Sequence, residues 1–346
     1  MRPLRVFHVL IRPMHTHTIF RRPGRLCLNR AIGLGLAAAL IAWRPPSPSA
    51  AAYKKETAPF SIAFEDEESA YLETSVFVMP KAALQIRVAA GPPGEYSIEA
   101  DDGQLARRGP RSWQWDAPAK PGLFKLEVKG PPHTDTITVR AFVMVPAVEI
   151  KDGYLNGYRI GTYPDTPPKG NPLYRAPPGF VEVTKGNQDT RVSPHFRLKQ
   201  FVCKQEPLAQ FPKYVVLEER LILNLETILE EVNAGGFDAD TLHVMSGYRT
   251  PYYNGVLRDV RYSMHQFGGA ADIFVDRRDK GVMDDLTRDG RVDLQDARYL
   301  HDLIDAMLMR PPLRKFEGGM GYYPATSAHP PFVHVDVRGS RARWQG

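Results

Sequence analysis

The chain has 346 residues and a formal charge of +6, with 45 Lys and Arg against 39 Asp and Glu. The first 52 residues contain eight of the arginines and no Asp, Glu or Lys, which leaves 37 basic and 39 acidic residues in the remainder. A chain that is nearly neutral beyond residue 52 lacks the basic surface that binds phosphate backbones, so we expect no nucleic-acid partner.

The first 52 residues have the pattern of an export signal. An arginine-rich segment precedes an apolar run of 13 residues, 31–43, and small residues and prolines follow it as far as Ala52. This order is typical of a signal peptide, and the run is shorter than the roughly 20 residues of a membrane-spanning helix. We expect cleavage near Ala52, with an uncleaved anchor as the alternative. The mature protein would then have no membrane span and would be periplasmic or secreted.

Beyond the signal the chain contains one cysteine, Cys203. A single cysteine cannot form an intrachain disulfide, and a lone cysteine is also a candidate nucleophile. Its neighbours Phe201 and Val202 are apolar, and no histidine pairing signature surrounds it. We therefore expect Cys203 to belong to the core.

Residues 53–150 are predicted to form an all-β domain. Short runs rich in Val, Ile, Phe and Tyr alternate there with Gly and Pro turns. The runs are 60–64, 75–79, 83–89, 95–100, 123–128 and 136–145. Six or seven such strands within about 100 residues predict an immunoglobulin-like sandwich. We expect this domain to position the protein on a cell wall or a protein partner.

The rest of the chain is predicted to be α+β. Residues 151–190 form a Pro/Gly-rich connecting segment that we expect to lie on the domain after it, 191–346. In that domain, apolar residues recur at helical spacing over 217–232 and 294–309, while 242–245 and 332–337 are expected as strands. We therefore expect a small antiparallel sheet with flanking helices.

Three residues of this domain form a candidate zinc set: His265, Asp272 and His334. Two neutral imidazoles and a carboxylate bind zinc and leave a fourth position open for water, an arrangement that hydrolyses amides. The small residues 268–271 would let the chain turn tightly between His265 and Asp272, and His334 would come from a strand. The alternative is two ordinary polar histidines and a turn-capping Asp272.

Four segments together resemble the zinc D-alanyl-D-alanine carboxypeptidase and murein endopeptidase family. They are SGYRTP at 246–251, SMHQFGGAAD at 263–272, GMGYY at 319–323 and FVHVD at 332–336, and SPHF at 193–196 also matches. The resemblance covers roughly 190–346 and does not include the β domain. It implies a zinc peptidase that acts on peptidoglycan peptides.

The resemblance also implies a role for each matching position. Zinc would be bound by His265, Asp272 and His334, and Ser263 would support the His265 backbone within the substrate-binding part of the site. Arg249 would bind the substrate carboxylate or the tetrahedral oxyanion, two tasks that suit a guanidinium. The alternative for Arg249 is a structural ion pair.

One position departs from the family pattern. Several members have a glutamate three residues before the last zinc histidine, as general base, and Pro331 stands there in this chain. Asp336 shares the predicted strand face of His334, so we expect it to be the base, with orientation of His334 as its alternative role. His329 and Glu317 are further candidates.

A second acidic segment, 285–296, has the spacing of a calcium-binding loop. Its positions 1, 3, 5, 7, 9 and 12 are Asp285, Thr287, Asp289, Arg291, Asp293 and Asp296. A glycine stands at position 6, while Thr at the third position and Asp at the twelfth depart from the usual residues. The alternative is an acidic turn that caps the following helix, with Asp293 as its N-cap.

These features lead to one principal expectation and two alternatives. We expect a zinc-dependent D,D-carboxypeptidase or murein endopeptidase, with zinc and also calcium as bound metals. The first alternative is a non-catalytic, metal-containing module that binds peptidoglycan, in which Pro331 marks the loss of turnover. The second is a periplasmic adhesion or scaffold protein that docks through the calcium loop.

Overall fold

A computed structural model describes residues 53–132 and 135–346, which belong to one compact unit. The predicted export signal lies outside the described residues. The structure is α+β and mostly β, in agreement with the expected class. Among the described residues, no helix is both long and apolar enough to cross a membrane.

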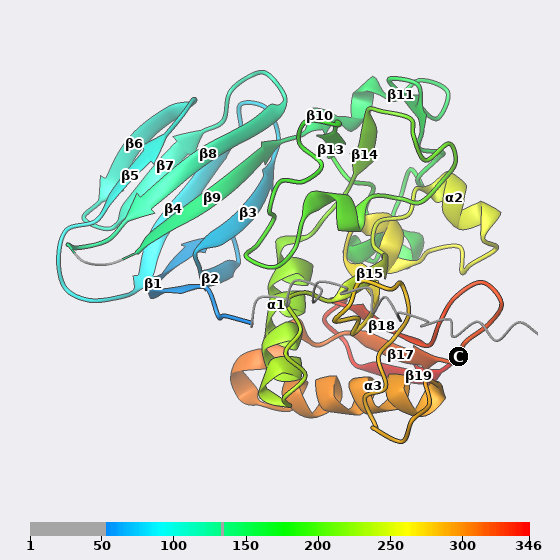
Figure 1. The fold of residues 1–346 in the computed structure, drawn as a ribbon. Coiled ribbons are helices and arrows are strands. Elements are labelled where there is room, and N and C mark those ends of the chain that lie inside the picture. The colour runs from blue at the N-terminus through cyan, green and yellow to red at the C-terminus, as the bar shows by residue number, and fades with distance from the viewer. Residues whose placement is uncertain (1–52, 133–134) are drawn as a thin grey trace, which may run out of the picture. The chain divides into compact units, whose positions relative to one another are not determined.

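The N-terminal strands form two sheets (Figure 1). One has the order β2-β1-β4-β7-β6 and the other β3-β9-β8-β5, and all neighbours are antiparallel except β3 and β9. The strands are β1 Thr57–Phe64, β2 Glu67–Tyr71, β3 Glu73–Val78, β4 Ala83–Ala90, β5 Ser97–Ala100, β6 Gln104–Gly109, β7 Ser112–Asp116, β8 Gly122–Lys129 and β9 Thr136–Val143.

The two sheets share one hydrophobic core. Ile62 and Trp115 enter it from the first sheet, and Leu126 and Val139 enter it from the second. The alternation of buried and exposed residues along β4 follows the two-residue repeat of a strand. Strands β2, β6 and β7 were not among the predicted runs. Strand β6 is an edge strand with an exposed, polar sequence, so it lacks the apolar pattern on which the prediction rested.

The segment between the sandwich and the last third of the chain contributes two small sheets. One has the order β10-β13-β14 and the other is the pair β11-β12. Their bounds are β10 Val145–Pro146, β11 Tyr154–Leu155, β12 Tyr158–Arg159, β13 Gly179–Val183 and β14 Lys213–Val215. A second hydrophobic core lies in the α+β part of the chain, and Ile160 is fully buried in it. The hydroxyl of Tyr163 lies 2.9 Å from that of Tyr248. The segment therefore packs on the α+β part, as expected.

A five-stranded sheet carries the candidate site, in the order β15-β16-β18-β17-β19. Its strands are β15 His243–Ser246, β16 Ala270–Phe274, β17 Gly319–Tyr323, β18 Phe332–Asp336 and β19 Ala342–Gln345. The sheet was expected to be antiparallel, but β17 and β19 are parallel. Strand β18 is antiparallel to β17, and the chain reverses again before β19, so β19 runs in the same direction as β17.

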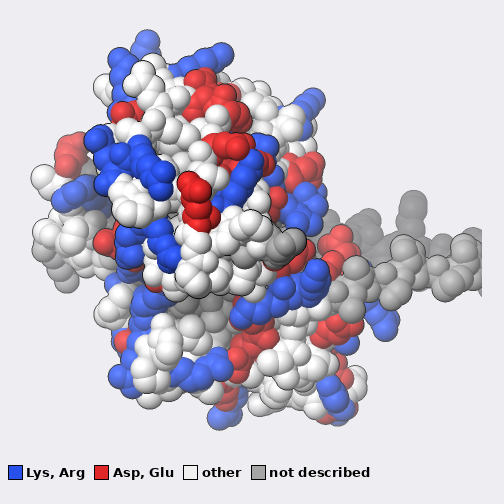
Figure 2. Space-filling view, turned by 90° about the vertical axis from the view of Figure 1, so that its left-hand side faces the viewer, with Lys and Arg blue, Asp and Glu red and all other residues white. Residues whose placement is uncertain are grey.

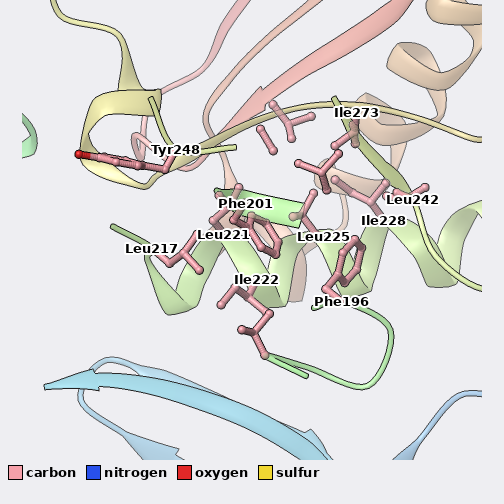
Figure 3. Close-up of a cluster of buried hydrophobic side chains, with 14 of the residues drawn as sticks. Phe196, Phe201, Leu217, Leu221, Ile222, Leu225, Ile228, Leu242, Tyr248 and Ile273 are labelled. Carbon is pink, nitrogen blue, oxygen red and sulfur yellow. The ribbon is translucent and has the colours of Figure 1, made fainter. Parts of the chain in front are cut away.

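Three α-helices accompany this sheet: α1 Glu219–Ala234, α2 Pro251–Val256 and α3 Leu294–Leu308. Helix α1 lies close to the predicted range, and Gly235 ends it. Its apolar face, with Leu221, Leu225 and Ile228, packs into the second core (Figure 3). Short 3-10 turns complete the structure: η1 Ala147–Glu149, η2 Pro168–Gly170, η3 Pro172–Tyr174, η4 Leu198–Phe201, η5 Met264–Phe267 and η6 Pro311–Phe316.

Charged side chains of both signs mix on the surface. On the described part of the face in Figure 2, Lys and Arg alternate with Asp and Glu. One pocket of about 230 Å³ is strongly acidic, with five carboxylates and one arginine in its wall. It lies beside the start of α1 and the β1–β2 turn, and none of the candidate zinc ligands lines it. The lining residues are Phe64, Glu65, Asp66, Glu67, Glu218, Glu219 and Arg220.

Candidate metal centre

The site begins where β15 passes into α2. A Cβ atom on Gly247 would lie 2.7 Å from the Cα atom of Phe201, so glycine allows the turn to run against that backbone. The N–H of Tyr248 donates to the carbonyl of Phe201 at 2.9 Å. Thr250 then caps α2 by accepting a hydrogen bond from the N–H of Tyr253 at 3.0 Å. These contacts fix the backbone on which Arg249 stands.

The turn η5 carries His265 and is joined to the same backbone. The N–H of Arg249 donates to the His265 carbonyl at 3.0 Å, and His265 Nδ1 lies 2.6 Å from the Gly247 carbonyl oxygen. A carbonyl can only accept, so Nδ1 carries the proton and Nε2 has a free lone pair. Gly268 ends the turn at φ +78°, with no room for a Cβ beside the Val216 carbonyl.

Strands β16 and β18 supply the other two side chains. Asp272 and His334 are direct partners across these antiparallel strands. Asp272 Oδ1 lies 2.9 Å from His334 Nδ1 and 3.2 Å from His265 Nε2, and the two ring nitrogens are 3.1 Å apart. The exposed fractions are 1% for His265, 2% for Asp272 and 8% for His334. The three donor atoms therefore converge in a buried place.

The electrostatics of the group keep Asp272 ionised. Burial alone would raise the pKa of Asp272, but the charge of His265, hydrogen bonds to both histidines and the charge of Arg249 hold it well below its usual value. Burial lowers the pKa of His265. Burial would also lower the pKa of His334, but hydrogen bonds to Asp272 and Asp336 raise it to about 9. A metal at this place would therefore displace a proton from His334.

The donor set fits a transition-metal ion. Among the described residues, two His/Asp groups could hold a metal ion, and His265, Asp272 and His334 form the fully buried one. Two imidazole nitrogens and a carboxylate oxygen suit zinc better than calcium or magnesium, which prefer oxygen. Tetrahedral zinc with bonds near 2.0 Å separates its ligand atoms by about 3.3 Å. The observed separations are close to that value, so the residues fit the ion with little movement.

Arg249 lies beside the candidate metal group. Its Nη2 donates to Asp272 Oδ2, its Nη1 to Asp259 Oδ2 at 2.6 Å, and its Nε to Ser246 Oγ at 2.7 Å. The side chain therefore makes the ion pairs of the structural alternative and is also placed next to the candidate ligands. The partnership with Asp259 was not predicted, because nothing in the sequence around Asp259 marks it.

Asp336 is buried and contacts Nε2 of His334, the ring nitrogen that does not face Asp272. Its Oδ2 is 3.3 Å from His334 Nε2, and its Oδ1 accepts from the N–H of Gly319 at 2.8 Å and from the N–H of Arg338 at 3.1 Å. The Arg338 guanidinium also binds both oxygens. Burial would raise the pKa of Asp336, but His334 and Arg338 hold it below its usual value.

These contacts match the alternative role of Asp336, which is to orient His334. Its role as general base stays a prediction. Arg338 was not predicted, although it continues the alternation that places His334 and Asp336 on one strand face. Ser263 lies at the start of η5 and is buried, and its carbonyl accepts from the N–H of Gln266. Within the described residues the Ser263 hydroxyl forms no hydrogen bond.

The loop 285–296 uses its carboxylates differently. Asp285 accepts hydrogen bonds from the backbone N–H groups of 288–290, and Asp289 accepts from the N–H of Arg291. Asp296 accepts from two further N–H groups, and the Thr287 hydroxyl lies within 3.3 Å of both Asp285 and Asp296. None of the aspartates of this loop belongs to the groups of described residues whose potential metal-ligand atoms converge.

Asp293 is the N-cap of α3, as the capping alternative predicted. Its side chain accepts from the N–H of Gln295 at 2.8 Å, and its own N–H donates to Asp296 Oδ2 at 2.9 Å. Together these bonds form a capping box. Calcium binding by this loop stays a prediction.

Comparison with known proteins adds little to this description. No family model matches the chain, and no curated protein matches it. One similar solved structure is the crystal structure of the titin M3 domain, at 12% identity and a TM-score of 0.17. The match covers 24% of this chain and 97% of that one. A likeness at that score supports no conclusion about fold or function.

Proposed function

We propose that the protein is a zinc-dependent peptidase that hydrolyses peptidoglycan stem peptides, as a D,D-carboxypeptidase or a murein endopeptidase in cell-wall remodelling. One observation carries the proposal: His265 Nε2, Asp272 Oδ1 and His334 Nδ1 lie within 3.2 Å of one another in a buried place, with Arg249 on the second oxygen of Asp272. The motif resemblance supplies the substrate class.

Each residue has a separate task in this proposal. His265, Asp272 and His334 would hold the zinc, which when bound supplies a Lewis acid for amide hydrolysis. The Gly247 carbonyl keeps the proton on His265 Nδ1. Asp336, itself held by Arg338, orients the ring of His334. Fixed ligand orientations of this kind raise metal affinity.

Arg249 would recognise the negative charge of the substrate or the reaction centre. Its Nη1 binds Asp259, a partly exposed residue, so a substrate carboxylate could replace that contact. Its Nε bond to Ser246 keeps the guanidinium plane fixed while this exchange takes place. A guanidinium that keeps its orientation can bind a carboxylate with two parallel hydrogen bonds.

Digestion of purified peptidoglycan tests the proposal. The exported protein should release terminal alanine if it is a carboxypeptidase, or convert dimeric muropeptides to monomers if it is an endopeptidase, as measured by mass spectrometry. A zinc chelator and the His265→Ala substitution should each abolish the product. Asp302→Asn is the control, because this side chain is 60% exposed and lies on α3. A product that persists in the chelator and in His265→Ala contradicts the proposal.

A second function is favoured by one specific observation. The Asp336 carboxylate already accepts hydrogen bonds from Arg338 and Gly319. Pro331 stands where several members of the resembled peptidase family have a glutamate base. A site with its ligands but without an available base would bind peptidoglycan peptides without cleaving them. Zinc-dependent retention of the protein on peptidoglycan, with no released product, would identify this non-catalytic module.

A further inference from the structure

A second His/Asp group lies at the end of the β15–β16 strand pair opposite to Asp272. His243 begins β15, Asp276 follows the end of β16, and Asp279 lies in the next turn. His243 pairs with Phe274 across the two strands, and its ring stacks on that of Phe274 with centroids 4.4 Å apart. Ser246 pairs with Asp272 in the same ladder. The two groups therefore occupy opposite ends of one strand pair.

The donor atoms of this second group are suitably spaced for a cation. One ligand atom from each of the three residues lies within 4.8 Å of the others. His243 Nδ1 and Asp276 Oδ2 are 3.9 Å apart, which is too far for a direct hydrogen bond. The ligand atoms of a tetrahedral zinc ion are about 3.3 Å apart. The gap between the two side chains is thus slightly wider than a bound ion requires.

The side chains are also available to a ligand. Within the described residues, neither ring nitrogen of His243 has a hydrogen-bond partner, and the Asp279 carboxylate has none either. Asp276 is buried, and the backbone N–H groups of Arg278 and Gly281 bind its two oxygens at 3.3 and 2.6 Å. These bonds fix the direction of the carboxylate without neutralising its charge.

Three charged groups act on His243: Lys204, Asp276 and Asp279. Burial lowers the pKa of His243, and the positive charge of Lys204 lowers it further, against the opposing effect of Asp276 and Asp279. The same positive charge on Lys204 would repel a cation bound beside His243.

We propose that His243, Asp276 and Asp279 form a second divalent-metal site, which takes a transition-metal ion such as zinc. An imidazole with two carboxylates suits such an ion better than calcium or magnesium. A metal here would tie the turn after β16 to the start of β15. Asp279 is exposed, so the ion would exchange with solvent more readily than one at His265, Asp272 and His334. This site does not depend on the proposed peptidase activity.

Zinc stoichiometry tests the second site. Metal-free full-length protein is titrated with zinc by calorimetry, and its zinc content is measured after equilibrium dialysis. The native protein should bind two ions per chain, and His243→Ala should bind one. Asp279→Asn should bind the second ion at least tenfold more weakly, and because this residue is exposed the variant should fold normally. Lys204→Met, which removes the repelling charge, should bind the second ion several-fold more tightly.

The outcomes separate this site from the first one. Two ions in His243→Ala, or one ion in both the native protein and His243→Ala, would overturn the second site. One ion in the native protein and none in His243→Ala would support it while contradicting the zinc set of His265, Asp272 and His334. If His243→Ala does not fold, the paired changes in affinity in Asp279→Asn and Lys204→Met decide the question, and no change in either overturns the site.

Discussion

Two regions of this chain have the sequence pattern of a metal site, but their side chains have different partners in the structure. In the group of His265, Asp272 and His334, donor atoms from separate elements face one another at 2.9 to 3.2 Å. In the loop 285–296, Asp285 and Asp296 accept hydrogen bonds from backbone N–H groups of the loop itself.

The difference shows what a sequence pattern leaves open. Carboxylates at regular spacing can serve a cation or the backbone, since both supply positive charge to an oxygen lone pair. The donor atoms of His265, Asp272 and His334 come from three separate elements and contact one another instead of the backbone N–H groups of their own segment, so their convergence needs another explanation. Convergence of distant donors is therefore a stronger indication of a metal site than spacing within one loop.

The largest expected effect is the loss of zinc on neutralising Asp272. Asp272→Asn removes the anionic ligand that both histidines and Arg249 contact, and it should leave the protein with one zinc ion fewer per chain after dialysis. The matching change in the loop, Asp289→Asn, should leave the zinc content unaltered. If both variants keep the native zinc content, the contrast between the two regions is lost.

A smaller effect is expected at Asp336. Because this carboxylate orients His334, Asp336→Asn should weaken zinc binding about 10- to 100-fold, and Arg338→Ala should weaken it in the same direction. Competition with a chelating dye measures the affinity. Unchanged affinity with lost turnover would instead identify Asp336 as the general base. Unchanged affinity and turnover would remove it from both roles.

Glu219 is a third kind of carboxylate, which forms no ion pair with a basic side chain among the described residues. Burial, with added repulsion from Glu65 and Glu218, raises the pKa of Glu219 to about 8. The folded state therefore holds a proton that the unfolded chain releases above about pH 4.5, so this stabilising contribution is present at low pH and disappears as the pH rises through 8.

Glu219→Gln should flatten this pH dependence. The amide retains the oxygen that accepts from the N–H of Phe77. From pH 5 to pH 9 the native protein should lose roughly 2 kcal/mol of unfolding free energy that the variant keeps. Each pKa unit corresponds to about 1.4 kcal/mol, and the total is reduced because solvent reaches part of the side chain. Urea unfolding at both pH values measures it, with Glu127→Gln on the sandwich surface as control. A parallel pH profile in variant and native protein would contradict the prediction.

The smallest effect is expected in the loop. Asp293→Ala removes the N-cap of α3 and should lower the unfolding free energy by about 1 kcal/mol in calcium-free buffer. Thermal unfolding with and without calcium tests both roles of the loop. A calcium-dependent rise in melting temperature that Asp289→Asn abolishes would support the calcium loop. No change on Asp293→Ala would contradict the capping role seen in the structure.

The sequence by itself determined the elements with a strong repeat. The helical spacing of Leu221, Leu225 and Ile228 predicted α1 to within two residues, since one face of this helix must be buried. The strand alternation around His334 and the glycine-rich turn before Asp272 were also readable locally. Strand β6 was not, because an exposed edge strand need not alternate.

Only the tertiary structure decided which side chains meet. Asp259 reaches Arg249 from an unmarked segment after α2, and the group of His243, Asp276 and Asp279 depends on the pairing of β15 with β16. The pairing of β19 with β17 likewise follows from the path of the whole chain. Local patterns record the burial of single elements, whereas contacts between elements depend on register and packing, which no single segment encodes.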